Sequence, residues 1–245
     1  MNVVAVIPAR YASSRFPGKL LAKETGKYLI EHVYEQVCQA GLVDRVLIAT
    51  DDRRIGQASD EFGAPWRMTR GDHISGTDRI AEVAGSLEAD IIVNVQGDEP
   101  EIEPESIDQM IELLRGDDRA DMATLAAPFP PGEDEDVNNP NVVKVVVDRN
   151  GHALYFSRWP IPYQRDEKDN KPLYRKHLGV YAYRREVLAR LSKLEPTPLE
   201  KAEKLEQLRA LENGIVIAVG QVERSAEGID TSEQYSKFVK RYKSR

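Results

Sequence analysis

The sequence is poor in cysteine and lacks the common metal-binding and hydrolase motifs. Its single cysteine, Cys38, excludes an internal disulfide and falls at an apolar position of the helix expected over residues 28 to 40. This position predicts a packing role rather than a reactive thiol. No cysteines and histidines have zinc-ligand spacing, and no G-x-S-x-G segment is present. A disulfide scaffold, a zinc module and the usual serine hydrolase are therefore excluded.

Basic runs and long apolar stretches are also missing. The 245 residues carry 34 lysines and arginines against 41 aspartates and glutamates, which gives a net charge of -7. Because the chain is acidic, we expect any local group of cations to serve a small anionic ligand rather than nucleic acid. No apolar stretch approaches a membrane span, and residues 2 to 7 lead into a basic loop rather than a cleavage site. We expect a soluble, cytoplasmic protein that binds neither nucleic acid nor membrane.

Apolar runs and helical stripes alternate in the first half of the chain. Runs at residues 3–7, 46–49 and 91–95 are typical of buried strands, the short segment at 66–69 is expected to be a third strand, and helical spacing follows each of the four. The resulting βαβαβαβα order over residues 2 to 115 predicts a mostly parallel, doubly wound α/β sheet with helices on both faces.

The second half of the chain has a different character. Residues 128 to 140 form a connection rich in proline, glycine and acids, with no periodicity. Asn150 and Gly151 separate two apolar runs and predict a hairpin, because Asn-Gly readily adopts positive φ. We expect this hairpin, together with the polar loop from Gln164 to Lys171, to form a small lobe beside the main sheet.

Two capping boxes predict helices near the C-terminal end of the chain. Thr197 and Glu200, with Pro198 in the first turn, predict one helix that runs to about residue 212. Thr231 and Gln234 predict a last helix whose apolar stripe packs against the core. Further strands are expected at residues 121–126, 176–183 and 215–219.

A cationic loop follows the first predicted strand. It carries Arg10, Arg15 and Lys19, together with the hydroxyl groups of Ser13 and Ser14. A solvated surface loop would explain these charges, but ligands of open α/β sheets bind at the carboxyl ends of the strands. The position therefore favours a polyanion such as a nucleoside triphosphate. No G-x-G-x-x-G motif and no Walker A spacing are present, so a dinucleotide site and a P-loop are disfavoured.

Two isolated carboxylates also follow predicted strands. Asp98 lies in the turn from Gly97 to Pro100, and Asp230 precedes the Thr231 cap. Each aspartate fits either of two roles, a ligand for Mg²⁺ that bridges phosphates or an ordinary residue at a helix start. For Asp230 the helix-start interpretation is the stronger one on local sequence alone.

Six segments, taken in order, resemble a known family. They are Pro8 to Lys19, Ser75 to Arg79, Asn94 to Pro100, Ala153 to Arg158, His177 to Tyr181 and Leu205 to Arg209. Together they resemble the 3-deoxy-manno-octulosonate (Kdo) cytidylyltransferases, or CMP-Kdo synthetases, nearly end to end. The first segment is common to many sugar nucleotidyltransferases, and the later ones are more specific.

The resemblance implies a nucleotide-diphospho-sugar-transferase type of sheet in a single domain over residues 1–245, with a hairpin lobe that forms a homodimer. Within it, residues 1–126 would bind nucleotide, 127–185 would hold the lobe and sugar-site segments, and 186–245 would complete the site. The implied reaction joins CTP and Kdo into CMP-Kdo and pyrophosphate with Mg²⁺. It needs no protein nucleophile, and a dedicated general base is optional, so none is assigned.

The resemblance also implies roles for individual residues. The residues implied for CTP are Ala9, Arg10, Ser14, Arg15, Lys19, Ser75, Thr77, Arg79 and Gln96. Those implied for the sugar acid are Arg158, His177, Tyr181, Glu206 and Gln207. Asp98 and Asp230 would hold the metal and, with Arg10 and Lys19, form the catalytic group. Alternatives are 8-amino-Kdo, another sugar acid or another nucleotide as substrate, and a non-catalytic nucleotide-binding protein.

Overall fold

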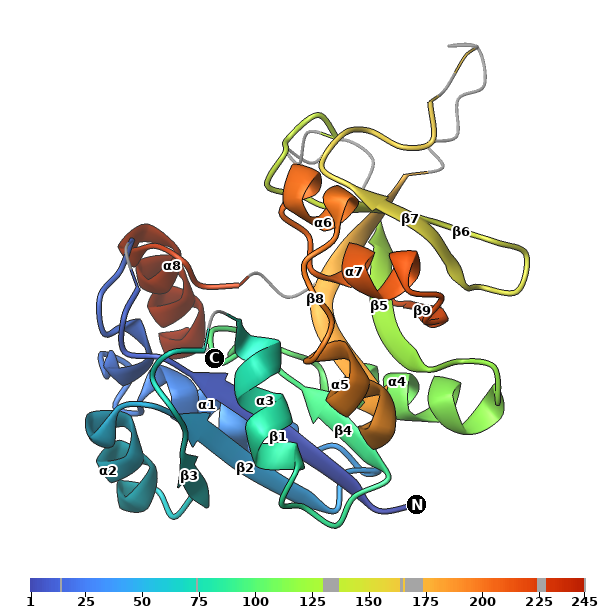
Figure 1. Ribbon diagram of the computed structural model, residues 1–245. Coiled ribbons are helices and arrows are strands. Elements are labelled where there is room, and N and C mark those ends of the chain that lie inside the picture. The colour runs from blue at the N-terminus through green and yellow to red at the C-terminus, as the bar shows by residue number, and fades with distance from the viewer. Residues whose placement is uncertain are drawn as a thin grey trace. The chain divides into compact units, whose positions relative to one another are not determined.

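The computed structural model describes residues 1–13, 15–73, 75–129, 137–163, 165, 174–223 and 228–244 (Figure 1). The chain forms two compact units, one of Met1–Asp108 with Ala226–Arg245 and one of Gln109–Ser225. The helix α4 (Pro104–Gly116) begins in the first unit and ends in the second. The predicted functional division at residues 126 and 185 stays a prediction.

Four strands form the sheet of the first unit. They are β1 (Val3–Ala9), β2 (Arg45–Thr50), β3 (Trp66–Met68) and β4 (Ile91–Asn94). Their order is β3-β2-β1-β4, and every neighbouring pair is parallel. All seven residues of β1 are buried, as expected of a strand that is covered on both faces. The predicted parallel α/β sheet is confirmed.

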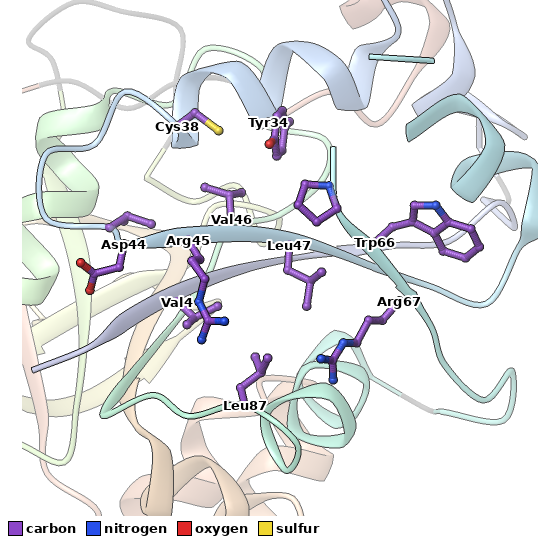
Figure 2. Close-up of a pocket in the computed structure, with 12 residues that line it drawn as sticks. Val4, Tyr34, Cys38, Asp44, Arg45, Val46, Leu47, Trp66, Arg67 and Leu87 are labelled. Carbon is purple, nitrogen blue, oxygen red and sulfur yellow. The ribbon is translucent and has the colours of Figure 1, made fainter. Parts of the chain in front are cut away.

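Five helical elements complete the first unit beside the start of α4. They are η1 (Lys19–Leu21), α1 (Leu29–Val37), α2 (Arg53–Glu61), α3 (Gly76–Ala84) and α8 (Ser232–Lys243). Figure 2 shows Tyr34 and Cys38 on one face of β2 and Leu87, just after α3, on the other. Both faces of the sheet are therefore covered, as predicted for a doubly wound fold.

The prediction for Cys38 is wrong. The helix α1 ends at Val37, earlier than expected, and Cys38 is its exposed C-terminal cap. The Cys38 N–H donates to the carbonyl of Tyr34, 2.9 Å away, and the next residues turn toward Gly41. Cys38 therefore lies past the buried stripe that the periodicity assigned to it.

The strand order places a topological switch point in the first unit. β2 and β3 lie on one side of β1, whereas β4 lies on the other, with Val6 opposite Asn94. The loops that leave β1 and β4 therefore start next to each other at the carboxyl edge of the sheet. Crevices at such a point bind ligands in open α/β sheets.

The second unit contains a mixed sheet and a hairpin. β5 (Met122–Pro128) pairs antiparallel with β8 (Arg175–Arg184) and parallel with β9 (Ile217–Gln221). The predicted hairpin is confirmed as β6 (Lys144–Val147) and β7 (Ala153–Ser157). Its turn has Gly151 at φ 83°, the conformation that Asn-Gly favours.

The helices of the second unit differ from the prediction at one place. The expected single helix after the Thr197 capping box is two helices, α6 (Pro198–Glu203) and α7 (Gln207–Glu212). Lys204 adopts φ 55° between them, and the buried Leu205 follows. The left-handed residue ends the first helix, and periodicity does not reveal such a break. The helix α5 (Arg185–Leu191) was not predicted.

No helix in the described ranges is long and apolar enough to cross a membrane.

Candidate functional site

A cavity of about 350 Å³ lies at the switch point of the first unit. Its walls come from the exit loops of β1 and β4 and from the first residue of α3. The lining residues are Pro8, Arg10, Ala12, Ser13, Arg15, Lys19, Leu20, Gly76, Gln96, Gly97 and Asp98. The cationic loop and the Asp98 turn, which are far apart in the sequence, therefore share one cavity.

Gly97 allows the two exit loops to approach each other. A Cβ on Gly97 would lie 3.1 Å from the Pro8 carbonyl oxygen and 3.5 Å from the Leu20 methyl groups. The Pro8 carbonyl belongs to the backbone of a buried strand and cannot move aside as the end of a flexible side chain could. A larger residue at position 97 would therefore push the Asp98 turn away from the cationic loop.

The cationic loop is closed by Tyr11 and Gly18. The Gly18 N–H donates to the Tyr11 carbonyl over 3.1 Å, and Gly18 has φ 70°. A Cβ on Gly18 would lie 3.2 Å from the Tyr11 ring, and the Arg54 guanidinium stacks on that ring at 3.3 Å from its centroid. The loop is thus tied to the start of α2 by a cation–π contact.

Two carboxylates and two cations meet at the cavity and form what we call the carboxylate cluster, namely Arg15, Lys19, Asp98 and Asp230. Lys19 Nζ lies 2.6 Å from Asp98 Oδ2 and 3.0 Å from Asp230 Oδ1. It also donates to the Ile229 carbonyl over 2.8 Å, and Arg15 Nη2 lies 2.8 Å from Asp230 Oδ2. Such charge-assisted hydrogen bonds are the stronger kind in proteins.

The contacts of Asp98 and Asp230 show how each residue relates to the helix that follows it. Thr231, not Asp230, caps α8, because its hydroxyl accepts the Gln234 N–H. The Ile229 N–H donates to the Asp98 carbonyl over 2.8 Å, which brings the two aspartates together. Asp98 is likewise no helix cap, since its side chain pairs with Lys19 and α4 begins only at Pro104. Asp98 is therefore not a helix cap, whereas Asp230 lies directly before the cap of α8, with its N–H bonded to Gln234 and its carboxylate paired with Lys19 and Arg15.

The donor set of the cluster fits Mg²⁺ with substrate oxygens as further ligands. The described part of the chain has no group of three or more His, Cys, Asp or Glu side chains placed to hold a metal. Asp98 and Asp230 supply two hard carboxylates, and Lys19 shows that a cation is accommodated between them. Mg²⁺ is usually bound by one or two carboxylates together with substrate phosphates.

Glu99 is a neighbour of the cluster that the sequence did not single out. Burial, with a smaller contribution from the Asp98 charge, raises the pKa of Glu99 to about 8. The shift favours the protonated, uncharged form of Glu99 beside Asp98. The adjacent acids in Asp98-Glu99 were the signal that could have drawn attention to it.

Several residues predicted to bind CTP lie outside the cavity lining. Ala9 is buried in β1, the Ser75 hydroxyl caps α3 by accepting the Asp78 N–H, and Thr77 is buried. Ser14 lies outside the described residues. Gln96 does line the cavity, and its amide nitrogen donates to the Asn94 side chain over 3.1 Å.

Arg79 is a core residue in this structure. Its side chain is 0% exposed and lies 2.8 Å from Asp51, just after β2. It also donates to the hydroxyl of Thr69, just after β3. Its guanidinium thus joins the exits of two strands instead of lining the cavity. The predicted contact of Arg79 with CTP stays a prediction.

Four rings of the second unit form what we call the aromatic cluster, namely Phe156, His177, Tyr181 and Tyr183. The His177 ring lies 4.8 Å from Phe156 and 5.5 Å from Tyr181, and Tyr181 lies 5.8 Å from Tyr183, measured between centroids. His177 and Tyr181 belong to the predicted sugar residues. The structure therefore brings these two together.

The two predicted sugar residues of the aromatic cluster, His177 and Tyr181, are neutral at neutral pH. Burial lowers the pKa of His177 to about 3. Its Nε2 lies 3.0 Å from the Thr124 hydroxyl, which donates to the Val180 carbonyl over 2.8 Å. Thr124 thus joins the His177 ring to the backbone of β8. Burial and, to a smaller extent, Tyr183 and Glu206 raise the pKa of Tyr181. Glu206 and the buried Gln207 lie at the start of α7.

Arg158 makes backbone contacts in the same unit. Its guanidinium donates to the carbonyls of Glu203 at 2.6 Å, Pro140 at 2.8 Å and Lys204 at 3.3 Å. Arg158 thus holds the junction of α6 and α7 just before Glu206 and Gln207. Its predicted bidentate contact with a sugar carboxylate stays a prediction.

A second cavity, of about 510 Å³, lies at the opposite end of the first unit's strands (Figure 2). Its lining includes Val4 and Arg45 near the starts of β1 and β2, together with Tyr34, Trp66 and Leu87. None of the predicted site residues lines it. Because ligands bind at the carboxyl ends of such strands, the smaller cavity is the candidate site.

Comparisons with known proteins show the family of the chain. A model of the cytidylyltransferase family matches residues 4–224. The 3-deoxy-manno-octulosonate cytidylyltransferase of Pelobacter propionicus is 54% identical over 253 residues, which cover 100% of this chain and 98% of that protein. The protein of the same name from Geobacter metallireducens is 50% identical over 250 residues, which cover 98% of each chain.

Solved structures give the same result. A structure of CMP:2-keto-3-deoxy-manno-octonic acid synthetase in complex with CTP has a TM-score of 0.94 and 45% identity, and the match covers 100% of this chain and 99% of that one. A 4-diphosphocytidyl-2C-methyl-D-erythritol synthase from Anaerococcus prevotii has a TM-score of 0.64 at 15% identity, covering 100% and 96% of the two chains, which is a likeness of fold alone. The chain belongs to the cytidylyltransferase family, and the curated relatives named above, which it matches over nearly its full length, are 3-deoxy-manno-octulosonate cytidylyltransferases.

Proposed function

We propose that this protein is an Mg²⁺-dependent cytidylyltransferase that transfers CMP from CTP to the anomeric hydroxyl of Kdo, releases pyrophosphate and so activates the sugar for lipopolysaccharide synthesis. The observation that carries the proposal is the carboxylate cluster at the switch-point cavity. Lys19 and Arg15 there lie beside Asp98 and Asp230, in a chain about half identical to Kdo cytidylyltransferases. The combination of cations and carboxylates suits a triphosphate with its divalent metal.

The proposed roles at the nucleotide follow the cavity. Arg10, Arg15 and Lys19 bind the triphosphate, with Ser14 and the backbone beside Ala9. Gln96, Ser75, Thr77 and Arg79 surround the cytidine. In the reaction the sugar oxygen forms a bond to the α-phosphorus, the bond from that phosphorus to the pyrophosphate oxygen breaks, and the hydroxyl proton is released. Lys19 and Arg10 neutralise charge that grows on the leaving pyrophosphate.

Asp98 and Asp230 are the proposed metal ligands. Mg²⁺ held there would supply positive charge that neutralises phosphate oxygens. The two carboxylates are adjacent because Ile229 and Asp98 share a backbone hydrogen bond. The main chain thus brings the two residues together, and Lys19 bonds to both carboxylates.

The sugar acid is proposed to contact the aromatic cluster and the start of α7. Neutral His177 and Tyr181 offer hydrogen bonds to sugar hydroxyls, and Glu206 and Gln207 add an acceptor and an amide. Arg158 is the proposed partner of the carboxylate, for which its guanidinium must exchange backbone carbonyls for the ligand. Kdo and its 8-amino analogue share these groups, so either fits the proposal.

We also propose that the protein is a homodimer through the hairpin region. Leu154, Trp159 and Tyr163 are 62%, 76% and 85% exposed, which is unusual for side chains of this size. They lie in β7 and in the segment that follows it. Cytoplasmic location stays a prediction.

The function is tested by mixing the protein with CTP, Mg²⁺ and Kdo and measuring pyrophosphate and CMP-Kdo. We expect release of pyrophosphate that depends on all three additions. A parallel series with 8-amino-Kdo, sialic acid and UTP tests the choice of substrate. Absence of release with both Kdo and 8-amino-Kdo would overturn the proposal, whereas a preference for UTP or sialic acid would assign a different nucleotidyltransferase.

A further inference from the structure

The Lys19 ammonium lies between the two carboxylates that we propose as metal ligands. It contacts Asp98 at 2.6 Å, Asp230 at 3.0 Å and the Ile229 carbonyl at 2.8 Å. We propose that Lys19 is an exchangeable cation. In the nucleotide-free protein it neutralises the carboxylates, and when nucleotide and divalent metal bind it moves from the carboxylates to the phosphates. This inference rests on the proposed function, because it uses Asp98 and Asp230 as metal ligands.

Charge balance is the first argument for the exchange. Two carboxylates of the cluster face two cations, Lys19 and Arg15, so the cluster has no net charge. A divalent ion is therefore not attracted to the nucleotide-free cluster as it would be to two bare carboxylates. The Lys19 side chain is only 11% exposed, so solvent screens its contact with Asp98 weakly.

The main chain keeps the two aspartates together without Lys19. The Ile229 N–H donates to the Asp98 carbonyl, and Gln234 Oε1 accepts the N–H groups of Asp230 and Thr231 at 2.9 and 3.0 Å. Removal of the ammonium would thus leave the main chain of residues 98 and 230 in place, with one cation fewer beside their carboxylates. Such a site has a net negative charge and gains affinity for a divalent ion.

The nucleotide provides the other half of the exchange. Lys19 lines the cavity together with Arg10 and Arg15, and its side chain has four rotatable methylene groups on a backbone fixed in η1. A triphosphate in this cavity offers Lys19 new anionic partners, so the carboxylates become available to the metal. By linkage, the nucleotide and the metal then raise each other's affinity.

The experiment measures metal binding without nucleotide. Mn²⁺ serves as the probe, and the free ion is counted by electron paramagnetic resonance in solutions of wild type, Lys19→Met and Lys27→Met. We expect Lys19→Met to bind Mn²⁺ at least about tenfold more tightly than wild type. The substitution removes one positive charge, which leaves the cluster with a net charge of about -1. Lys27→Met is the matched control, since Lys27 pairs with Glu35 elsewhere on the unit, and should equal wild type.

Two further variants locate the effect and guard against misfolding. Lys19→Met with Asp98→Asn should lose the gain, which assigns the tighter site to the carboxylate cluster. If Lys19→Met does not fold, Lys19→Gln replaces it, because a neutral amide still donates hydrogen bonds. Mg²⁺ should also raise the thermal midpoint of the Lys19 variant more than that of wild type.

The outcomes separate the two proposals. Equal Mn²⁺ affinity of wild type and the folded Lys19 variant would overturn the exchange, even if wild type releases pyrophosphate from CTP and Kdo. If the Lys19 variant binds Mn²⁺ tenfold more tightly but wild type releases no pyrophosphate from CTP and Kdo, the exchange would be supported and the proposed function overturned.

Discussion

The carboxylate cluster and the aromatic cluster satisfy their polar groups in opposite ways. In the first, Lys19 and Arg15 form ion pairs with the side chains of Asp98 and Asp230. The charged groups of a ligand can replace these ion pairs. In the second, His177 is buried and neutral, and the Thr124 hydroxyl bonds to its Nε2. The carboxylate cluster therefore contains charged groups that can change partners when a ligand binds. The aromatic cluster contains uncharged groups that are held in place.

The difference matches the chemistry proposed for each region. Transfer of a nucleotidyl group moves negative charge among phosphate oxygens, so the first region needs cations that can change partners. Recognition of a sugar ring needs groups held in one geometry, and burial of His177 and Tyr181 provides that at the cost of their ionisation. Substitutions in the first region should accordingly reduce turnover, and substitution of His177 in the second should in addition change how stability depends on pH.

The largest effect is expected from Asp98→Asn. The substitution keeps the shape of the side chain but removes one carboxylate charge from the cluster. We expect turnover at saturating CTP to fall by at least about a thousandfold, roughly 4 kcal/mol of transition-state stabilisation. The steady-state rate of pyrophosphate release measures this, with circular dichroism as the control for folding. Unchanged turnover in a folded variant would remove Asp98 from the metal site.

Lys19→Ala tests the cation of the same cluster. If Lys19 faces charge that develops on pyrophosphate, its loss should cost ~3 kcal/mol, about a hundredfold in kcat/KM, as for the loss of one oxyanion donor. Lys27→Ala, which removes a surface lysine paired with Glu35, should leave kcat/KM unchanged. A cost below about 1 kcal/mol for Lys19→Ala, less than a tenfold change, would make Lys19 a peripheral cation.

The sequence predicted the first region better than the second. Strand spacing located the exits of β1 and β4, and the rule for open α/β sheets placed a ligand there. The approach of Asp230 to Asp98 was not predictable from local pattern, because it depends on a hydrogen bond between residues 229 and 98. Only the resemblance to Kdo cytidylyltransferases joined these two residues beforehand.

Long-range partners explain the other differences from expectation. Arg79 lies in a motif near the cavity, but its guanidinium bonds to Asp51 and Thr69, and nothing in the local sequence predicts these partners. The break between α6 and α7 depends on Lys204, whose backbone lies in the left-handed region. The Arg158 guanidinium donates to the Lys204 carbonyl. Periodicity reports which face of a helix is apolar, not where a tertiary contact ends it.

The smallest effect is expected at His177, where pH should change stability. The pKa of His177 is lowered to about 3 in the folded protein from an ordinary value of 6.5. Between these values the unfolded chain binds more protons than the folded one, so stability falls as pH falls below about 6.5. Between pH 8 and pH 5 the loss due to His177 should be about 2 kcal/mol.

Urea unfolding of wild type and His177→Gln at the two pH values isolates this contribution, because the glutamine does not titrate. The variant is expected to lose about 2 kcal/mol less than wild type on acidification, whatever its stability at pH 8. Parallel losses in the two proteins would mean that His177 ionises in the folded state as freely as in the unfolded one. The aromatic cluster would then be able to carry charge, and its contrast with the carboxylate cluster would disappear.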